Sequence, residues 1–178
     1  MKVICCGDSN TWGYDPCDKF VQHYSRRWTD ILAEKTGWNV VNEGVNGREV
    51  PDFPVCLDVG TDLFLVMLGT NDLLQLDTPE AAADRMEVFL SGGDPKKLVL
   101  IAPPPMVWGA WVQEQELIDD SLRMARLYEA LAGRMGIRFV DSGQWKVPLC
   151  FDGVHFTQDG QVVFAEGLVN ALRNLSVL

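Results

Sequence analysis

Residues 3–11 form the sequence Val-Ile-Cys-Cys-Gly-Asp-Ser-Asn-Thr, in which a short apolar run ends at Gly7-Asp8-Ser9. An apolar run of this length, bounded by glycine, is typical of a buried strand. In open parallel α/β sheets, ligands bind at the carboxyl edge of the strands. The stretch therefore predicts a strand that presents the Ser9 hydroxyl at this edge, although a serine there is equally consistent with a helix N-cap or a tight turn.

The rest of the chain alternates apolar runs with helical patterns, which favours a parallel sheet covered on both faces. The predicted strands are 3–6, 39–41, 63–68, 98–102 and 137–140, with the most apolar run, 63–68, in the centre. The predicted helices are 25–35, 78–90, 116–135, 157–175 and a short one within 50–60. Ser25 is expected to cap the first helix and Gly37 to end it. The predicted fold class is α/β, with one domain over residues 1–178.

Composition excludes several classes of partner. The 178 residues are 47% hydrophobic and 22% charged, as in ordinary globular proteins, and the net charge of −10 would repel nucleic acid and anionic membranes. No apolar stretch approaches the roughly 20 residues that span a bilayer, and the N-terminal run is too short for a signal peptide. The five cysteines show no regular spacing and suit a reducing compartment. We therefore expect a cytoplasmic protein with no nucleic-acid or membrane partner.

A serine nucleophile needs a base, and the chain has two histidines. His155 follows Asp152 by three residues, so the carboxylate can bind its Nδ1 and leave Nε2 free for the serine proton. His23 stands in a polar patch just before a predicted helix and is expected to be an exposed surface residue. Two distant histidines and scattered cysteines match no metal-ligand spacing, so neither a metal nor another cofactor is expected.

Acyl transfer also needs hydrogen-bond donors that face the developing oxyanion. Asn71, in Gly69-Thr70-Asn71-Asp72, follows the strand 63–68, and the loop 42–47 follows the strand 39–41. A glycine in that loop could offer an unobstructed backbone N–H. Each signal alone is weak, because Gly-Thr-Asn-Asp is also a common strand-to-helix turn. Four loops with the required residue types at one sheet edge together indicate a hydrolase.

These four blocks resemble those of the GDSL or SGNH hydrolases, and they occur in the order of that family. Ser9, Gly47 and Asn71 match the first three blocks, and Asp152 with His155 matches the Asp-x-x-His block. The resemblance implies a flavodoxin-like three-layer α/β/α sandwich with a five-stranded parallel sheet. It also implies ester hydrolysis in which Ser9 attacks, His155 shuttles the proton and Asp152 orients His155. The N–H groups of Ser9 and Gly47 and the side chain of Asn71 would hold the oxyanion.

Details of the blocks narrow the resemblance. Residues 11–14 (Thr-Trp-Gly-Tyr), 102–105 and 152–156 are most similar to the arylesterase and acyltransferase branch of the family. Asn10 stands where the GDSL block has leucine, and it has no chemical role in the triad scheme. The region after Gly47 is short, where relatives often carry a longer helix or insertion. No Gly-x-Ser-x-Gly surrounds the serine, which excludes the nucleophile elbow of the α/β-hydrolase fold.

Loops after the predicted strands supply candidate substrate-binding residues, which are Trp12, Tyr14, Arg48, Met106, Val107, Trp108 and Trp111. Aromatic walls would favour small acyl groups or aryl leaving groups, although tryptophans on loops also often pack on neighbouring loops. Arg48 is expected either to pair with an acid such as Glu43 or Asp72 or to meet a polar substrate.

The sequence thus predicts a serine esterase that acts on short-chain or aryl esters through an acyl-enzyme on Ser9, with acyl transfer to alcohols as a second outcome. The expected partner is a small-molecule ester, and a homo-oligomer stays open. A carbohydrate O-deacetylase or a thioesterase with the same triad is an alternative activity. A catalytically silent binding module of the same fold is the alternative outside enzymes.

Overall fold

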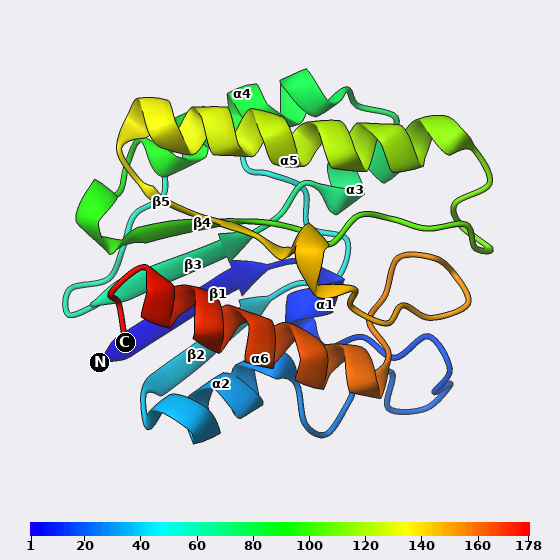
Figure 1. Cartoon of the computed structure of the whole chain (residues 1–178), viewed down its shortest axis with the longest axis horizontal. Helices are drawn as coiled ribbons and strands as arrows, with labels where there is room; N and C mark the ends of the chain where they lie inside the picture. The colour runs from blue at the N-terminus through cyan, green and yellow to red at the C-terminus, as the bar shows by residue number, and fades with distance from the viewer.

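The computed structural model describes residues 1–178 as a parallel sheet of five strands in the order β2-β1-β3-β4-β5 (Figure 1). The strands are β1 (Lys2–Gly7), β2 (Asn39–Gly44), β3 (Leu63–Met67), β4 (Leu98–Ala102) and β5 (Arg138–Asp141). All five predicted strands are therefore confirmed, with β3 in the centre and strand ends shifted by at most three residues.

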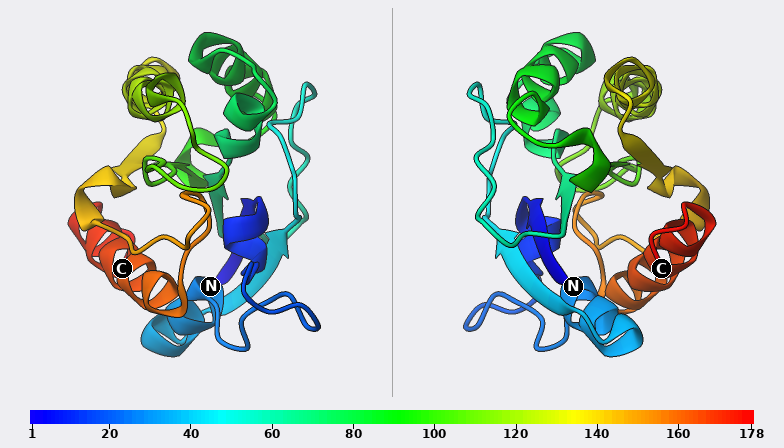
Figure 2. Two further views of the ribbon diagram at one scale, coloured as in Figure 1. Left: turned by 90° about the vertical axis from the view of Figure 1, so that its right-hand side faces the viewer. Right: turned by 90° about the vertical axis from the view of Figure 1, so that its left-hand side faces the viewer.

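Four long helices cover the two faces of the sheet (Figures 1 and 2). One face carries α2 (Trp28–Thr36) and α6 (Gln158–Asn174), and the other carries α4 (Pro79–Leu90) and α5 (Gln115–Met135). Side chains of β1 alternate between the two cores, since Ile4 and Cys6 pack with α4 and α5. The predicted three-layer α/β/α sandwich is confirmed. None of the helices is both long and apolar enough to cross a membrane.

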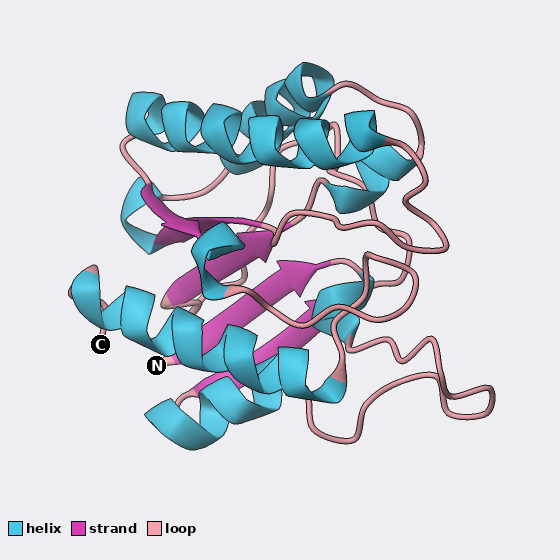
Figure 3. Cartoon of the chain, turned by 45° about the vertical axis from the view of Figure 1, so that its right-hand side comes forward, coloured by secondary structure: helices cyan, strands magenta, loops and turns pink.

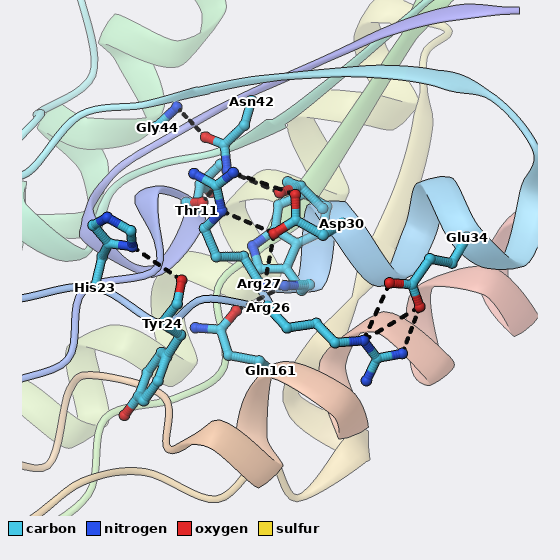
Figure 4. Close-up of polar contacts among 12 residues, drawn as sticks. Thr11, His23, Tyr24, Arg26, Arg27, Asp30, Glu34, Asn42, Gly44 and Gln161 are labelled. Carbon is cyan, nitrogen blue, oxygen red and sulfur yellow. Dashed lines mark hydrogen bonds and ion pairs between the residues drawn. The ribbon is translucent and has the colours of Figure 1, made fainter.

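The helix predicted to begin at Ser25 begins later, with Arg27 as its N-cap. The Asp30 carboxylate accepts a hydrogen bond from the Arg27 backbone N–H at 2.8 Å and pairs with its guanidinium, which fixes the first turn there (Figure 4). Gly37 ends the helix in the left-handed conformation, at φ +70°, as predicted. A side-chain carboxylate three residues into the helix thus determined its start more strongly than a serine hydroxyl further upstream.

Three of the four short elements absent from the sequence prediction lie at the carboxyl edge of the sheet, where the loops gather (Figure 3). Helix α1 (Ser9–Trp12) follows β1, and α3 (Thr70–Leu74) follows β3. The 3₁₀ turn η2 (Ser142–Trp145) follows β5 at this edge, whereas the 3₁₀ turn η1 (Pro95–Lys97) directly precedes β4 at the opposite edge. Both α1 and α3 start at most three residues after their strands end, so their first residues lie at the edge where ligands bind.

The helix expected within residues 50–60 is not formed, so that prediction was wrong. Prolines at 51 and 54 remove two backbone donors, and the segment instead bonds to its neighbours. The Val55 N–H donates to the Phe89 carbonyl at 2.8 Å, which fastens the segment to the end of α4.

The neighbouring strand β2 holds α1 in place. The Asn42 Nδ2 group donates to the Thr11 carbonyl at 2.7 Å and to the Thr29 hydroxyl at 2.8 Å, while its Oδ1 accepts from the Gly44 N–H (Figure 4). A Cβ on Gly44 would lie 2.1 Å from the Trp12 backbone nitrogen, so only glycine allows this close approach. The helix that carries Ser9 therefore rests directly on the end of β2.

Candidate active site

Ser9 is the first residue of α1, directly after the end of β1. The N-cap is Asp8, whose Oδ1 accepts a hydrogen bond from the Asn10 N–H at 2.9 Å. Burial raises the pKa of Asp8 to about 6, even though this hydrogen bond and the nearby His155 lower it. Because Asp8 caps the helix, the Ser9 hydroxyl is not needed for capping. Of the alternatives left by the sequence, the structure assigns the N-cap to the aspartate.

The structure brings His155 onto Ser9 across 146 residues of sequence. The His155 Nε2 atom lies 3.0 Å from the Ser9 Oγ, and its Nδ1 lies 2.7 Å from the Asp152 Oδ2. With a proton on Nδ1 donated to the carboxylate, the Nε2 lone pair accepts the hydrogen bond from the Ser9 hydroxyl. All three side chains are buried, and Ser9 is 6% exposed. This is the Ser–His–Asp geometry that the sequence predicted.

The Asp152 carboxylate is held by three hydrogen bonds. Its Oδ1 accepts from the N–H groups of Val154 at 2.9 Å and His155 at 3.0 Å, and its Oδ2 accepts from the imidazole. Burial pushes the pKa of Asp152 upward, but these hydrogen bonds outweigh it and hold the pKa below its ordinary value. The group is therefore an ionised carboxylate at neutral pH, as required to stabilise an imidazolium.

Two of the predicted oxyanion donors, Asn71 at the start of α3 and Gly47 in the loop after β2, lie on segments that contact each other. The Asn71 Nδ2 group, on α3, donates to the Arg48 carbonyl at 3.1 Å, next to Gly47. Gly47 itself has φ +73°, in the left-handed region that favours glycine. An amide nitrogen carries two hydrogens, so one Asn71 donor remains for a ligand. Because Gly7 lies opposite both Gly44 and Met67 in the sheet register, these loops leave the same edge as Ser9.

Aromatic rings enclose His155. The Tyr14 ring centroid lies 4.7 Å from the imidazole centroid, and the Trp111 ring meets it edge-on at 5.1 Å. Trp111 is nevertheless 52% exposed, so it forms part of the outer wall. Of the other predicted substrate-binding residues, Trp108 is exposed, whereas Met106 is buried and packs in the core beneath α4 and α5.

His23 is half-buried, so its predicted place on the exposed surface is wrong. Its Nδ1 lies 3.0 Å from the Tyr24 carbonyl oxygen (Figure 4), and its ring packs edge-on against Trp12 with centroids 5.1 Å apart. Trp12 in turn lies 6.5 Å from the Tyr14 ring. His23 and Trp12 thus pack next to Tyr14, whose ring contacts His155. The polar sequence around His23 gave no sign of this packing.

Arg48 pairs with neither predicted carboxylate. Its Nη1 donates to the Glu43 main-chain carbonyl at 2.7 Å and contacts the Cys6 Sγ at 3.3 Å. The side chain lines a cavity of about 460 Å³ between β1 and residues 51–58, and neither Ser9 nor His155 lines that cavity. The substrate contact predicted for Arg48 therefore gains no support from its position.

Three carboxylates, of Glu49, Asp72 and Asp77, come within 4.8 Å of one another beside α3. The Arg85 guanidinium donates to Asp72 at 2.6 Å and to Asp77 at 2.5 Å. The Arg85 guanidinium thus already pairs with two of the three carboxylates, so these two do not need a metal cation to balance their charge.

A cavity of about 420 Å³ lies beside the Ser9–His155 pair. Neither of these residues lines it, but Trp111, whose ring packs against His155, does. Four carboxylic residues and no basic residue line it, and the full set is Leu73, Leu76, Asp77, Thr78, Trp111, Gln113, Glu114, Glu116, Leu117 and Asp120. The cavity is therefore electronegative and bordered by one aromatic ring.

Asn10, for which the sequence predicted no chemical role, contacts the loop that carries His155. Its Nδ2 donates to the Val154 carbonyl at 3.1 Å, and its Oδ1 accepts from the Phe156 N–H at 2.9 Å. The one available signal was the replacement of the leucine of the GDSL block by a side chain with both a donor and an acceptor.

A buried Ser–His–Asp chain at the carboxyl edge of a parallel α/β sheet is the arrangement of a serine hydrolase. The model of the GDSL-like lipase/acylhydrolase family matches residues 5–163, so the chain belongs to this family of ester-hydrolysing enzymes, as the sequence blocks predicted. A search of curated protein sequences gives no match.

Solved structures agree over the full length of both chains. A putative arylesterase from Agrobacterium tumefaciens is 29% identical with a TM-score of 0.77, and the aryl esterase of M. smegmatis is 26% identical with a TM-score of 0.79. A carbohydrate acetylesterase family member from Sinorhizobium meliloti is 24% identical with a TM-score of 0.82, and at that identity it supports the fold alone.

Proposed function

We propose that this enzyme cleaves short-chain or aryl carboxylic esters through an acyl-enzyme on Ser9. The observation that carries the proposal is the continuous chain of hydrogen bonds from Ser9 Oγ through His155 to Asp152, at 3.0 and 2.7 Å. These distances lie within the hydrogen-bond reach that a nucleophile and its base require.

Acylation begins when the Ser9 Oγ attacks the ester carbonyl carbon and His155 Nε2 takes the hydroxyl proton. Asp152 stabilises the imidazolium, and the N–H groups of Ser9 and Gly47 with the free amide hydrogen of Asn71 bind the negatively charged carbonyl oxygen. The tetrahedral intermediate then collapses. The bond to the leaving alcohol or phenol breaks, and that oxygen receives the proton from Nε2.

Deacylation repeats these steps with water as the nucleophile. His155 Nε2 removes a proton from water, the resulting hydroxide attacks the acyl carbon, and the carboxylic acid leaves as Ser9 recovers its proton. An alcohol that takes the place of water would receive the acyl group instead. Acyl transfer is therefore part of the proposal and requires no additional residue.

The aromatic walls support the substrate class. Tyr14 and Trp111 flank the imidazole with flat apolar surfaces, which suit an aryl leaving group or a short acyl chain. Two relatives above 25% identity are described as an aryl esterase and a putative arylesterase. An acyl-CoA would bring several phosphates towards the four acidic residues of the cavity beside Trp111, which disfavours the thioesterase alternative.

The same cavity favours one second candidate, a carbohydrate O-deacetylase. A sugar ring can stack on Trp111, and its hydroxyls can donate hydrogen bonds to the acidic residues Asp77, Glu114, Glu116 and Asp120. Values of kcat/KM for p-nitrophenyl acetate, an acetylated sugar and acetyl-CoA would rank the three classes. We expect the aryl acetate to be first and acetyl-CoA to be last.

The proposal includes a small-molecule ester as the partner, turnover without a metal or other cofactor, and a cytoplasmic location. The net charge of −10 supports the absence of nucleic-acid and anionic-membrane partners. Addition of a chelator to the purified enzyme is expected to leave turnover unchanged, since the Ser–His–Asp scheme requires no cation.

The decisive test is turnover of p-nitrophenyl acetate by Ser9→Ala and His155→Ala, each of which should abolish measurable turnover. Ser91→Ala is the matched control, because that hydroxyl only bonds the Val88 carbonyl at the end of α4. Wild-type turnover in purified Ser9→Ala would refute the mechanism. A phosphonate probe that failed to label Ser9 in folded wild-type protein would favour a silent binding module.

A further inference from the structure

Asn10 connects the nucleophile helix to the turn that carries the catalytic base. Its carboxamide bonds the two peptide groups on either side of His155, the Val154 carbonyl at 3.1 Å and the Phe156 N–H at 2.9 Å. The side chain is 4% exposed, so water does not compete for these bonds. Because Asn10 immediately follows Ser9, the two bonded segments are those that must stay in register for proton transfer.

The other polar groups of the turn bond within the turn or to the loop after β4, whose Val107, Ala110 and Trp111 N–H groups donate to the carbonyls of residues 151–153. The N–H groups of Val154 and His155 donate to Asp152, and the His155 carbonyl accepts from the Cys150 N–H at 2.7 Å. These bonds fix the imidazole relative to Asp152, but none of them reaches α1. Among residues of β1 and α1, only Asn10 and Ser9 hydrogen-bond to this turn.

We propose that Asn10 is a positioning residue that sets the distance between Ser9 Oγ and His155 Nε2. The proposal rests on the proposed function, since it requires Ser9 to be the nucleophile. A planar carboxamide that uses its donor and its acceptor on two neighbouring peptide groups fixes the turn in both distance and orientation. Without it, the His155–Asp152 pair and the bonds to the loop after β4 stay intact, but the Ser9–His155 bond is the one remaining hydrogen bond between the turn and α1.

This role predicts a specific kinetic effect. The Asn10 side chain is buried and bonds backbone groups of the turn, so its loss should leave KM within about twofold while kcat falls. A misplacement of about 1 Å between reacting groups costs on the order of 100-fold, so we expect kcat to fall by about 10- to 100-fold. A residue that only contributes stability would lower Tm and leave the kcat of the folded enzyme unchanged.

The test compares Asn10→Leu, Asn10→Ala and Asn10→Asp in turnover of p-nitrophenyl acetate. Asn10→Leu supplies the leucine of the GDSL block at similar volume, so it removes both hydrogen bonds without a large cavity. Thr36→Val is the matched control. The Thr36 hydroxyl also makes one donated and one accepted backbone bond, at 2.7 Å to Leu32 and 3.2 Å from Trp38, at the opposite edge of the sheet.

Asn10→Asp adds a readout that a purely structural role would not move. When protonated, the introduced carboxyl can donate to the Val154 carbonyl and accept from the Phe156 N–H, as asparagine does; when ionised, it cannot donate. The ratio of variant to wild-type kcat should therefore rise as the pH falls for Asn10→Asp. It should stay constant with pH for Asn10→Leu and Asn10→Ala.

Wild-type kcat in folded Asn10→Leu would overturn the proposal, as would a loss confined to KM or a pH-independent ratio for Asn10→Asp. If Asn10→Ala does not fold, the leucine and aspartate variants still decide the question. Failure of the proposed function is recognised separately, by wild-type turnover that does not depend on Ser9.

Discussion

Replacement of Asp152 by asparagine should change the position of one proton while it leaves the fold intact. The carboxylate accepts three hydrogen bonds, two on Oδ1 from backbone N–H groups and one on Oδ2 from the His155 Nδ1. An amide can accept on one atom only. With its oxygen towards the two N–H groups, both backbone bonds are kept and the bond to Nδ1 must reverse its direction; with the amide flipped, two buried N–H groups lose their acceptor.

Each buried polar group left without a partner costs about 1–3 kcal/mol, so the first orientation is favoured. The amide NH₂ then faces Nδ1 and holds the imidazole with its proton on Nε2, where it cannot accept from Ser9. In serine proteases, the same change of tautomer lowers kcat by about 10⁴-fold, which corresponds to about 5 kcal/mol. We expect a loss of that order in Asp152→Asn, with a fall of about 1 kcal/mol in the free energy of unfolding.

Turnover of p-nitrophenyl acetate and urea unfolding measure the two effects separately. Asp141→Asn is the matched control, because Asp141 only caps η2 by accepting from the Gly143 N–H at 2.8 Å. A folded Asp152→Asn variant that retained more than about a tenth of wild-type kcat would refute the assignment of the tautomer to Asp152.

Three further predictions concern stability. Arg85→Met leaves the buried Asp72 carboxylate without the guanidinium at 2.6 Å, and should lower the free energy of unfolding by about 3–5 kcal/mol in urea titrations. The folded-state pKa of Asp8, about 6, lies above its ordinary value of 3.8, so ionisation of Asp8 lowers the stability of the fold as the pH rises between these two values. The free energy of unfolding of Asp8→Asn should therefore increase by about 2–3 kcal/mol relative to wild type between pH 4 and pH 7. Gly44→Ala should strongly destabilise the fold, because its Cβ would lie 2.1 Å from a backbone nitrogen, whereas Gly133→Ala on open helix surface should raise stability by about 0.5–1 kcal/mol in thermal melts.

A specific outcome would refute each of these predictions. Arg134→Met removes an exposed ion pair with Glu87 and should lower the free energy of unfolding by less than about 1 kcal/mol. An equal loss of stability in Arg85→Met and Arg134→Met would show that the burial of Asp72 does not strengthen the effect. A stability difference between Asp8→Asn and wild type that did not vary with pH would mean that Asp8 titrates normally. A Gly44→Ala variant as stable as wild type would show that α1 can move away from β2.

The sheet could be predicted because buried parallel strands leave continuous apolar runs between glycines and prolines. The triad could be predicted because Asp152 and His155 share one short loop and the carboxyl edge gathers the other blocks. The short helices α1 and α3 could not, since four or five residues are too few to show a helical period.

Contacts between distant segments were the other features that the sequence did not reveal. Asn10 meets residues 144 and 146 positions away, and His23 is covered by Trp12 across a loop. Neither contact leaves a local pattern, because both depend on how α1 sits on the finished sheet. The helix expected within 50–60 was a wrong prediction from a weak local pattern. Two prolines and the hydrogen bonds to α4 and Asp72 hold this segment in a non-helical conformation.

The 146-residue separation between Ser9 and His155 also makes catalysis a reporter of folding. Closure of so long a loop is entropically costly, and contacts of this kind form slowly compared with local helices. Any partly folded species in which β1 and the turn at 150–157 have not met is silent as an enzyme, however much helix it contains. Ester turnover recorded during refolding therefore times the formation of this strand-to-loop contact, whereas circular dichroism reports the helix content.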